Sequence, residues 1–289
     1  MEIKAYFKDA SFSSQLVICL FVFLLTNILV APFLLIGEDA FALRLIMFIS
    51  QLGTFVFSSF FLAYLFSDDA VTYLKIKLGI SWKIAIWIVV SMIVVLPFLN
   101  FTVFVNEAMK LPEWMKPLEE WMMASEAEIK EFTDTILSYN NWVDLVQNLI
   151  VVALMAALGE ELLFRGVLQN VFGKKIRNQH IIIWAVAILF SAIHLQFYGF
   201  IPRMLMGAYF GYLLYYTRSI WAPILAHFAN NAFVVLVTYK SSGISGQTDF
   251  DTIGTGQYWW LALISFIFWA FCLLKIVKFS RINVNTPLT

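Results

Sequence analysis

Long apolar runs, separated by short polar segments, divide this chain into helix-sized pieces. A helix that crosses the hydrocarbon core of a membrane needs about 20 mostly apolar residues. By that measure the chain has eight candidate spans, at residues 14–36, 41–66, 83–105, 142–164, 181–195, 200–216, 220–239 and 258–277. The pattern therefore predicts an all-α integral membrane protein with eight transmembrane helices, in which residues 1–289 form a single membrane domain.

The composition supports a membrane as the natural solvent of this chain. Of its 289 residues, 61% are hydrophobic and 13% are charged, whereas soluble domains carry about 25% charged residues. The formal net charge is zero, so no excess of positive charge indicates nucleic acid as a partner. We expect membrane lipids and a peptide or protein substrate at the membrane as partners; the sequence leaves the oligomeric state open.

Lysine and arginine are distributed unevenly over the connections between the predicted spans. If the N-terminus is cytoplasmic, the outer segments hold only six of the 19: Arg44, Lys110, Lys116, Lys130, Arg203 and Lys240. Arg165 lies within a span, and the others are on the inner side. Cytoplasmic connections carry the excess of positive charge in membrane proteins, so we predict that both termini are cytoplasmic, as an even number of spans requires.

Two connections stand out by composition. Residues 106–141 form a long acidic outer connector in which tryptophan and methionine alternate with glutamate. This pattern is compatible with an amphipathic helix on the outer face, with a lid over the bundle, and with a solvated connector. Residues 243–256 are rich in Gly, Ser and Thr, which is typical of a flexible loop.

Three polar clusters interrupt the apolar segments, and they hold the candidate chemistry. The first runs from Gly159 to Arg165, the second from Phe190 to His194, and the third from His227 to Asn231. Charged and imidazole side chains within a membrane almost always face the bundle interior or an aqueous cavity. The three clusters therefore predict one buried polar site that is assembled from three helices.

The spacing within each cluster suggests separate roles. Glu161 and Arg165 are four residues apart, so they share a helix face and can pair. Glu160 points about 100° away, without a partner at helical spacing, and such a carboxylate can act as a general base for water. A structural cluster of ion pairs between helices is the alternative for these residues.

The two other clusters supply imidazole and amide groups. Phe190 lies one turn before His194 and can wall the site from lipid. His227 and Asn231 are four apart on one helix face, where they can donate hydrogen bonds to a developing oxyanion. Ordinary packing remains the alternative for Phe190, and a hydrogen-bonded core histidine for His194.

Other sequence patterns limit the chemistry. The chain has no H-E-x-x-H zinc motif and no G-x-S-x-G nucleophile motif. Gly207 and Gly211 form a G-x-x-x-G pattern, which favours close packing between helices rather than a functional role.

The three ordered motifs resemble those of the CPBP family, which groups type II CAAX prenyl endopeptidases with bacterial Abi proteins. The motifs are Glu160-Glu161-x-x-x-Arg165, Phe190-x-x-x-His194 and His227-x-x-x-Asn231, and the similarity covers a core at about 142–239. The resemblance implies an eight-helix intramembrane protease, in a bacterial cytoplasmic (inner) membrane. In such an enzyme Glu160 and His194 would activate a water, His227 and Asn231 would stabilise the oxyanion, and Glu161 and Arg165 would orient the site.

The expected function is therefore that of an endopeptidase that cleaves a peptide bond near the cytoplasmic membrane face. We expect no cofactor, although Glu160, His194 and His227 form a donor set that could hold zinc. Two other functions remain open. One is a non-proteolytic Abi-type immunity or scaffold protein, and the other is a transporter or proton relay that uses the buried Glu and His residues. The sequence does not identify the substrate or its prenylation.

Overall fold

The computed structural model describes residues 4–242 and 252–284, and this part of the chain is helical, without a β-strand. The predicted all-α class is confirmed. In chain order the elements are α1 (Phe12–Val30), η1 (Ala31–Ile36), α2 (Ala40–Ser50), η2 (Gln51–Phe57), α3 (Ser58–Phe66), α4 (Ala70–Tyr73), α5 (Trp82–Val94), α6 (Leu96–Glu107), η3 (Glu113–Met115), α7 (Lys116–Ile136), α8 (Trp142–Asn148), η4 (Leu149–Met155), α9 (Ala156–Glu161), η5 (Leu162–Leu168), α10 (Gln169–Gly173), α11 (Gln179–Ala192), η6 (Phe197–Gly199), α12 (Phe200–Thr217), α13 (Trp221–Ser242), η8 (Gly256–Tyr258) and α14 (Trp259–Val284). The η2, η4 and η5 stretches are π-helical turns within longer helices.

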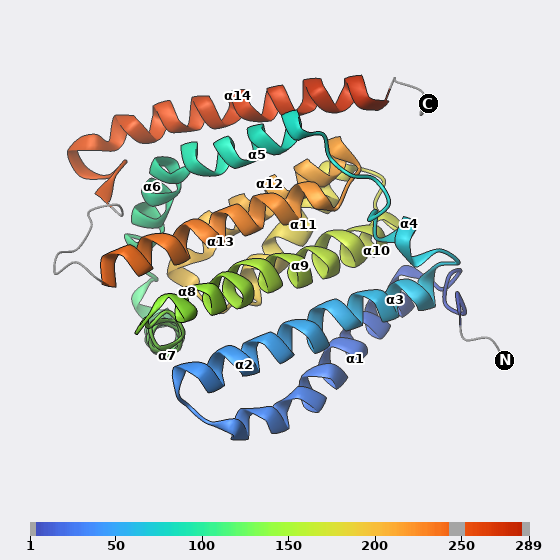
Figure 1. The fold of residues 1–289 in the computed structure, drawn as a ribbon, viewed down its shortest axis with the longest axis horizontal. Helices are drawn as coiled ribbons and strands as arrows, with labels where there is room; N and C mark the ends of the chain where they lie inside the picture. The colour runs from blue at the N-terminus through green and yellow to red at the C-terminus, as the bar shows by residue number, and fades with distance from the viewer. Residues whose placement is uncertain (1–3, 243–251, 285–289) are drawn as a thin grey trace.

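The helices lie side by side and run back and forth between two ends of a bundle (Figure 1). The first described residues, α4 and the last turns of α14 lie at one end, which we call the terminal end. The amphipathic helix α7 lies across the opposite end, which we call the α7 end. The predicted outer connector at 106–141 thus contains a long helix, whereas the predicted loop at 243–256 lies largely outside the described residues.

Several helices are long and apolar enough to cross a membrane. Five pass a test of length and hydropathy, at Phe12–Ile36, Ala40–Phe66, Trp142–Gly173, Trp221–Ser241 and Gly256–Ser280. The pair α5 and α6 passes as a sixth span that is bent by 43°. Pro97 stands at the start of α6, and a proline within a helix removes a backbone hydrogen bond and kinks the chain.

Two of the eight predicted spans fall short of this test, for different reasons. The helix α11 has 14 residues, which at 1.5 Å per residue is about 21 Å, less than the ~30 Å of the hydrocarbon core. The helix α12 has 18 residues, but Arg203 and its tyrosines lower its hydropathy. The helix α12 is largely buried among its neighbours, whereas α11 leaves Ile181, Trp184 and Ile188 exposed on one face.

Polar residues begin many of the helices, and their side chains explain where these helices start. An N-cap side chain accepts a hydrogen bond from a free N–H of the first turn. Side chains in this role are Ser11, Asp39, Asp69, Ser81, Asn141 and Asn178.

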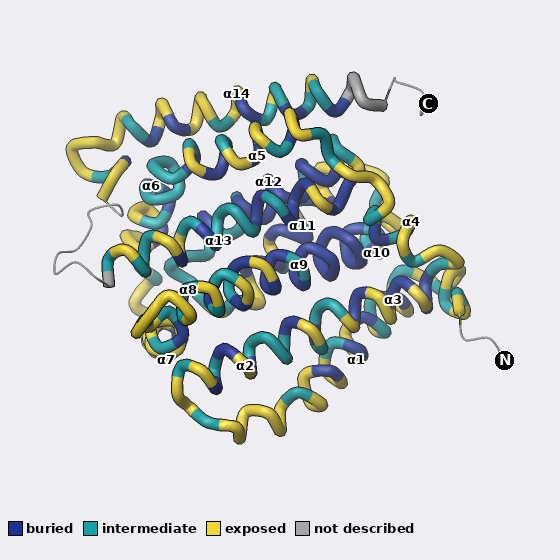
Figure 2. Tube along the Cα trace, viewed as in Figure 1, coloured by how far each residue is buried: buried dark blue, intermediate teal, exposed yellow. Residues whose placement is uncertain are grey.

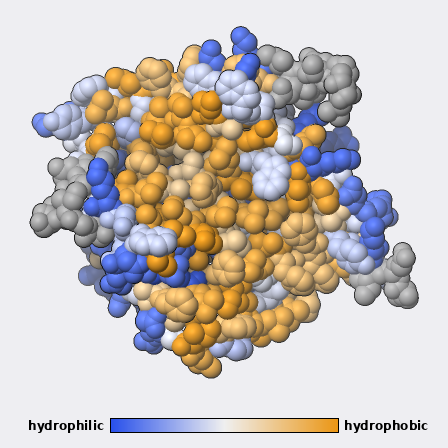
Figure 3. All heavy atoms as spheres, in the orientation of Figure 1, coloured by the Kyte–Doolittle hydropathy of each residue, from blue (hydrophilic) through white to orange (hydrophobic). Residues whose placement is uncertain are grey.

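The outer surface of the bundle is strongly apolar. On α14, Leu263, Ile267 and Leu274 are all more than half exposed, and apolar atoms cover the middle of the face in Figure 3, with hydrophilic residues gathered toward its left and right edges. Large exposed apolar patches indicate contact with another apolar phase. This surface, together with the helix lengths, indicates a membrane protein.

The stretch from α9 to the start of α10, within the continuous helix from α8 to α10, forms the centre of the bundle, as its dark colour in Figure 2 shows. Glycines permit its neighbours to approach closely. A Cβ atom at Gly159 would lie 2.8 Å from Phe55 Cβ of η2, and one at Gly211 of α12 would lie 2.8 Å from Ile183 Cγ2 of α11. Gly207 meets Ala187 of α11 in the same way, at 3.3 Å. The predicted close packing at Gly207 and Gly211 is confirmed.

A buried arginine holds the α7 end together. Arg44 of α2 is 3% exposed, although the charge count treated it as an outer interfacial residue. Its guanidinium donates to Asp144 Oδ1 at 2.6 Å and Asn148 Oδ1 at 3.1 Å, both on α8, and to the Ile136 carbonyl at 3.1 Å at the end of α7. One side chain thus connects three helices at this end.

Replacing Arg44 with alanine should lower the stability of the protein by about 3 kcal/mol, because it leaves the Asp144 carboxylate without its buried partner. Thermal unfolding of the purified protein in detergent measures the effect. Lys8→Ala is the matched control, since it removes the exposed ion pair between Lys8 and Asp68 and should change the melting temperature little. Equal shifts for the two variants would contradict the assigned role of Arg44.

Candidate functional site

The site is centred on a carboxylate that faces two imidazoles. Glu160 Oε2 lies 3.9 Å from His194 Nε2 and 4.0 Å from His227 Nε2. Glu160 and His227 are 8% and 6% exposed, whereas 27% of the His194 side chain is exposed. The structure thus brings these three predicted residues together from α9, from the residues just beyond α11, and from α13.

The partners of the two histidines determine which ring nitrogen faces Glu160 as an acceptor. His194 Nδ1 lies 2.7 Å from the Phe190 carbonyl oxygen, and His227 Nδ1 lies 2.8 Å from Glu161 Oε1. Both oxygens can only accept, so each Nδ1 carries the proton of the neutral ring. The remaining nitrogen, Nε2, then presents a lone pair in both rings. Two lone pairs and a carboxylate oxygen therefore converge on one small volume.

Beneath this volume lies a fully buried ion pair. Arg165 Nη1 donates to Glu161 Oε1 at 2.7 Å, and both side chains are 0% exposed, so they pair as their spacing predicts. Arg165 Nη2 donates to the Gly207 carbonyl of α12 at 2.9 Å. The Arg165 guanidinium carbon also lies 4.5 Å from the ring centre of Phe190 and 5.4 Å from that of Phe210. Two aromatic faces and two oxygens thus surround the cation.

Aromatic rings enclose the histidines. The Phe190 ring centre lies 5.0 Å from that of His194 and 6.1 Å from that of His227, in edge-to-face arrangements. Phe210 of α12 stacks on His227 at 5.1 Å, with 19° between the ring planes. Phe190 is among the predicted site residues, whereas Phe210 belongs to no motif and looks like an ordinary apolar residue within its helix.

The asparagine of the third motif makes its contacts away from the carboxylate. Asn231 Nδ2 donates to the Val152 carbonyl of η4 at 3.0 Å, and Asn231 Oδ1 accepts from Asn230 Nδ2 at 3.2 Å. Asn231 lies one turn beyond His227 on α13, but the structure does not bring it into hydrogen-bonding contact with Glu160. Its second amide hydrogen remains for another acceptor.

Local backbone features place the reacting groups. Glu160 follows Gly159, where the absence of a Cβ lets η2 pack directly against α9, and π-helical turns flank α9 on both sides. Such turns are frequent at functional sites. Leu195, directly after His194, has a left-handed φ of 53°, which ends the helical path and turns the chain toward η6. These features are not visible as sequence motifs.

A second arginine, which the sequence analysis counted only as an outer charge, lies next to the site. Arg203 near the start of α12 donates to the Gln196 side chain. Its charge lies within electrostatic reach of Glu160 and His194, and also of Glu126 on α7. Arg203 thus interacts electrostatically with both the acidic face of α7 and the Glu160 carboxylate.

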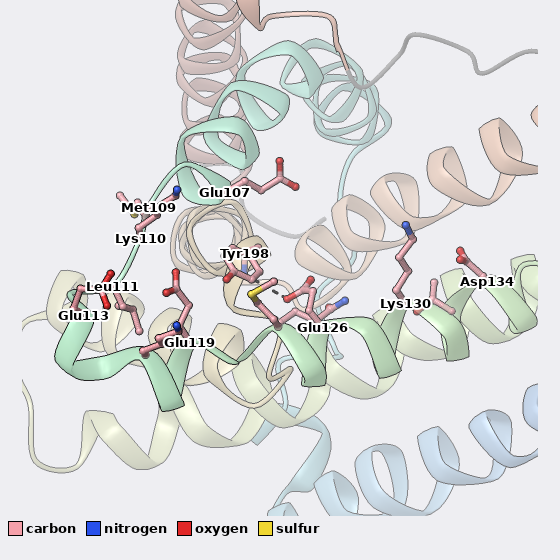
Figure 4. A pocket seen from close by; sticks show the side chains of 14 residues that line it. Glu107, Met109, Lys110, Leu111, Glu113, Glu119, Glu126, Lys130, Asp134 and Tyr198 are labelled. Atoms are coloured by element: carbon pink, nitrogen blue, oxygen red, sulfur yellow. Dashed lines mark hydrogen bonds between the residues drawn. The ribbon is translucent and has the colours of Figure 1, made fainter. Parts of the chain in front are cut away.

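A cavity of about 890 Å³ separates α7 from the rest of this end (Figure 4). Glu119, Glu126 and Lys130 extend from α7 toward it, and Tyr198 lies close to Glu126. Gln196 and Tyr198 contribute lining from the chain that follows His194. The cavity therefore extends to the residues that directly follow His194.

The depth of the site along the bundle depends on where its side chains stand in their helices. His227 is in the first third of α13, which begins beside the Ile220–Lys75 hydrogen bond of the terminal end. His194 stands three residues before η6, and η6 packs against α6 and α7. Glu160 thus meets side chains that come from both ends of the bundle, and its predicted place in the half nearest the cytoplasm stays a prediction.

The donor set is chemically suited to zinc, but its spacing is wide. Tetrahedral zinc with ligands at about 2.0–2.1 Å brings neighbouring donor atoms to about 3.3 Å, compared with the 3.9 and 4.0 Å found here. Among the residues that the structure describes, no group of three or more His, Cys, Asp or Glu side chains has the geometry of a metal site.

The fold and site define a class of protein: a helical membrane protein with a buried glutamate and two histidines at its centre. Residues 142–233 match the family described as type II CAAX prenyl endopeptidase Rce1-like, and this match confirms the resemblance to CAAX endopeptidases over that part of the chain. The uncharacterized protein YpbD of Bacillus subtilis (strain 168) is 30% identical over 91 residues, which are 30% of this chain and 43% of that protein. No solved structure matches the chain significantly.

The two adjacent glutamates should respond differently to the same substitution. Glu161→Gln should destabilise the protein by about 3 kcal/mol, because it leaves the buried Arg165 cation without its counter-charge. Glu160→Gln should leave the melting temperature nearly unchanged, since no described ion pair closer than 3.9 Å depends on that carboxylate. Thermal unfolding in detergent compares the two variants directly, and a larger loss for Glu160→Gln would reverse the assignment.

Proposed function

We propose that this protein is an intramembrane endopeptidase that hydrolyses a peptide bond with a water activated by Glu160 and His194. The observation that carries the proposal is the convergence of one carboxylate and two imidazole lone pairs inside an apolar bundle. The match of residues 142–233 to CAAX-type endopeptidases supports the same class of reaction.

The distances suit a water between the groups. A water donates hydrogen bonds of about 2.7–2.9 Å to two acceptors, so two acceptors 3.9 or 4.0 Å apart can share one water. Glu160 Oε2 and His194 Nε2 are both acceptors when His194 is neutral. Such a water donates one hydrogen bond to Glu160 and one to His194. Its oxygen lone pair is then free to attack the carbonyl carbon of the substrate. Glu160 takes the proton as the oxygen attacks, and returns it to the leaving amine.

The oxyanion forms on the other side of the attacked carbonyl, where His227 and Asn231 are the proposed donors. His227 Nδ1 is bonded to Glu161, so it donates through Nε2 only when both nitrogens are protonated. Asn231 donates through the amide hydrogen that Val152 does not use. Glu161 and Arg165 act as positioning residues, since they contact His227 and the backbone of α12 rather than the reacting atoms.

We also propose eight membrane crossings, with both termini in the cytoplasm of a bacterial cell and the protein in its inner membrane. The back-and-forth path of the helices and the excess of lysine and arginine at the terminal end support this orientation. In that orientation the α7 end is the outer one. The cleaved bond then lies near the cytoplasmic face, in keeping with the place of His227 in the first third of α13, which begins at the terminal end.

Glu160→Gln and His194→Ala should each reduce proteolysis at least about 100-fold, because each removes a group that handles the proton of the attacking water. Quantitative proteomics of membranes that express each variant measures the peptides released. Glu128→Gln and His180→Ala are matched controls, since both residues are exposed and lie outside the site. Normal release by Glu160→Gln would refute the protease and favour a scaffold or immunity role.

A metal-free reaction is the second part of the proposal. We expect elemental analysis of the purified protein to find less than stoichiometric zinc, and we expect cleavage to continue in the presence of a chelator. The reason is that Glu160 alone can take the proton, and the spacing of the three donors exceeds that of zinc ligands. One zinc per chain, together with loss of activity on chelation and recovery with zinc, would assign Glu160, His194 and His227 as ligands.

A further inference from the structure

A basic cavity opens at the terminal end of the bundle, far from the Glu160 site. It has a volume of about 900 Å³ and lies among the connection after α4, the start of α10, the end of α12 and the last part of α14. Three cations contribute to its lining, Lys75, Lys77 and Arg218, and none of the described lining residues is acidic. Such a cavity has a positive potential that attracts anions.

Two of these cations lie together without a counter-ion. The pKa of Lys75 is lowered, first by burial of the ammonium and then by the positive charge of Arg218. No salt bridge joins Lys75 or Arg218 to an acid among the described residues. Asp69 is the acid close to Lys77, but its carboxylate already caps α4 through Val71, Thr72 and the Thr72 hydroxyl. The repulsion between Lys75 and Arg218 is therefore uncompensated within the described chain.

The backbone holds the two cations in this position. Lys75 and Arg218 both have a left-handed φ of 57°, a conformation that residues with a Cβ rarely adopt. The Ile220 N–H donates to the Lys75 carbonyl at 3.1 Å, and the Trp221 indole donates to the Ile76 carbonyl at 2.9 Å. A cation at a helix C-terminus is favourable by itself. This does not explain why two residues with a strained backbone both place their cations at one partly buried cavity.

A buried amide at the same cavity lacks a partner. Gln169 of α10 lines the cavity and is 6% exposed, and its side-chain oxygen Oε1 has no hydrogen bond. Buried polar atoms are nearly always hydrogen-bonded, so this amide is open to a polar group that enters the cavity. An amide can accept from a hydroxyl, or donate to an anion when it is rotated by 180°. A ligand that carries both an anion and a hydroxyl satisfies the site.

We propose that this cavity binds a phosphate group, held by Lys75, Arg218 and Gln169, and that it belongs to the head group of an anionic phospholipid. Charge-assisted hydrogen bonds from lysine and arginine to phosphate oxygens are strong, and basic pockets between membrane helices bind anionic head groups. Tyr215 and Trp221, which are 41% and 40% exposed at this end, are residue types enriched at the membrane interface. Under the proposed orientation the cavity faces the inner leaflet.

The test is native mass spectrometry of the full-length protein in detergent, titrated with phosphatidylglycerol or with phosphatidylcholine. We expect saturable retention of one phosphatidylglycerol and weaker retention of phosphatidylcholine, whose head group is neutral overall. Lys75→Asn combined with Arg218→Asn should weaken phosphatidylglycerol binding at least about tenfold. Asparagine tolerates left-handed φ better than other residues with a side chain, so this double variant changes the charge with little effect on the backbone.

The matched control is Lys175→Asn combined with Arg177→Asn, which removes two exposed cations at the same end but outside the cavity. Equal weakening by the two double variants would overturn the proposal, because it would show only a general attraction to the positive end. Retention unchanged in the Lys75 and Arg218 variant would overturn it as well.

Two further experiments identify the source of the phosphate and control for misfolded variants. Inorganic phosphate that displaces the lipid, with the same dependence on Lys75 and Arg218, would assign the cavity to free phosphate esters as well. Lipid binding that inorganic phosphate leaves unchanged would assign it to the head group alone. Gln169→Leu, which keeps every charge and every strained residue, should weaken binding several-fold, and full affinity in this variant would remove the amide from the site.

Discussion

The buried Arg165 cation is the constraint on which the rest of the site depends. A guanidinium that is 0% exposed in an apolar bundle must be paired and hydrogen-bonded, since an uncompensated charge there is strongly destabilising. Glu161, the Gly207 carbonyl and the rings of Phe190 and Phe210 meet this requirement. They come from α9, α11 and α12, so the ion pair fixes how these helices pack.

The same ion pair determines the chemistry of the neighbouring groups. Glu161 accepts from Arg165 and from His227 Nδ1 through one oxygen, and this orients the imidazole with Nε2 toward Glu160. Glu160, the adjacent residue, points elsewhere around the helix and keeps a small exposed fraction. Two identical side chains thus differ in their environment, and this difference underlies the separate roles that we propose for them.

The two ends of the bundle have opposite character. At the α7 end, acidic and basic side chains line a mixed cavity. Arg44 donates to Asp144 of α8, and Arg203 donates to the Gln196 side chain just before η6. At the terminal end, Lys75 and Arg218 have no such partners. This asymmetry agrees with the direction of the positive-inside rule.

The sequence by itself determined the helical class, the membrane setting and the residues of the polar site. Apolar runs of about 20 residues leave few alternatives to a membrane helix, and the four-residue spacing of Glu161 and Arg165 was sufficient to predict their pairing. Likewise, the small residues Gly207 and Gly211 indicated close helix packing from their spacing alone. These features are local, so the chain carries them in its pattern.

Only the tertiary structure determined which helices contact one another and how far each is shifted along its neighbours. It brought Glu160, His194 and His227 together, because the shift of one helix past another depends on packing that no single segment encodes. It also showed Phe210, Arg203 and Arg44 as parts of buried contacts, although each looks ordinary in its own segment. The cavity with Lys75, Arg218 and Gln169 joins residues that are far apart in the chain, and long-range packing alone brings them together.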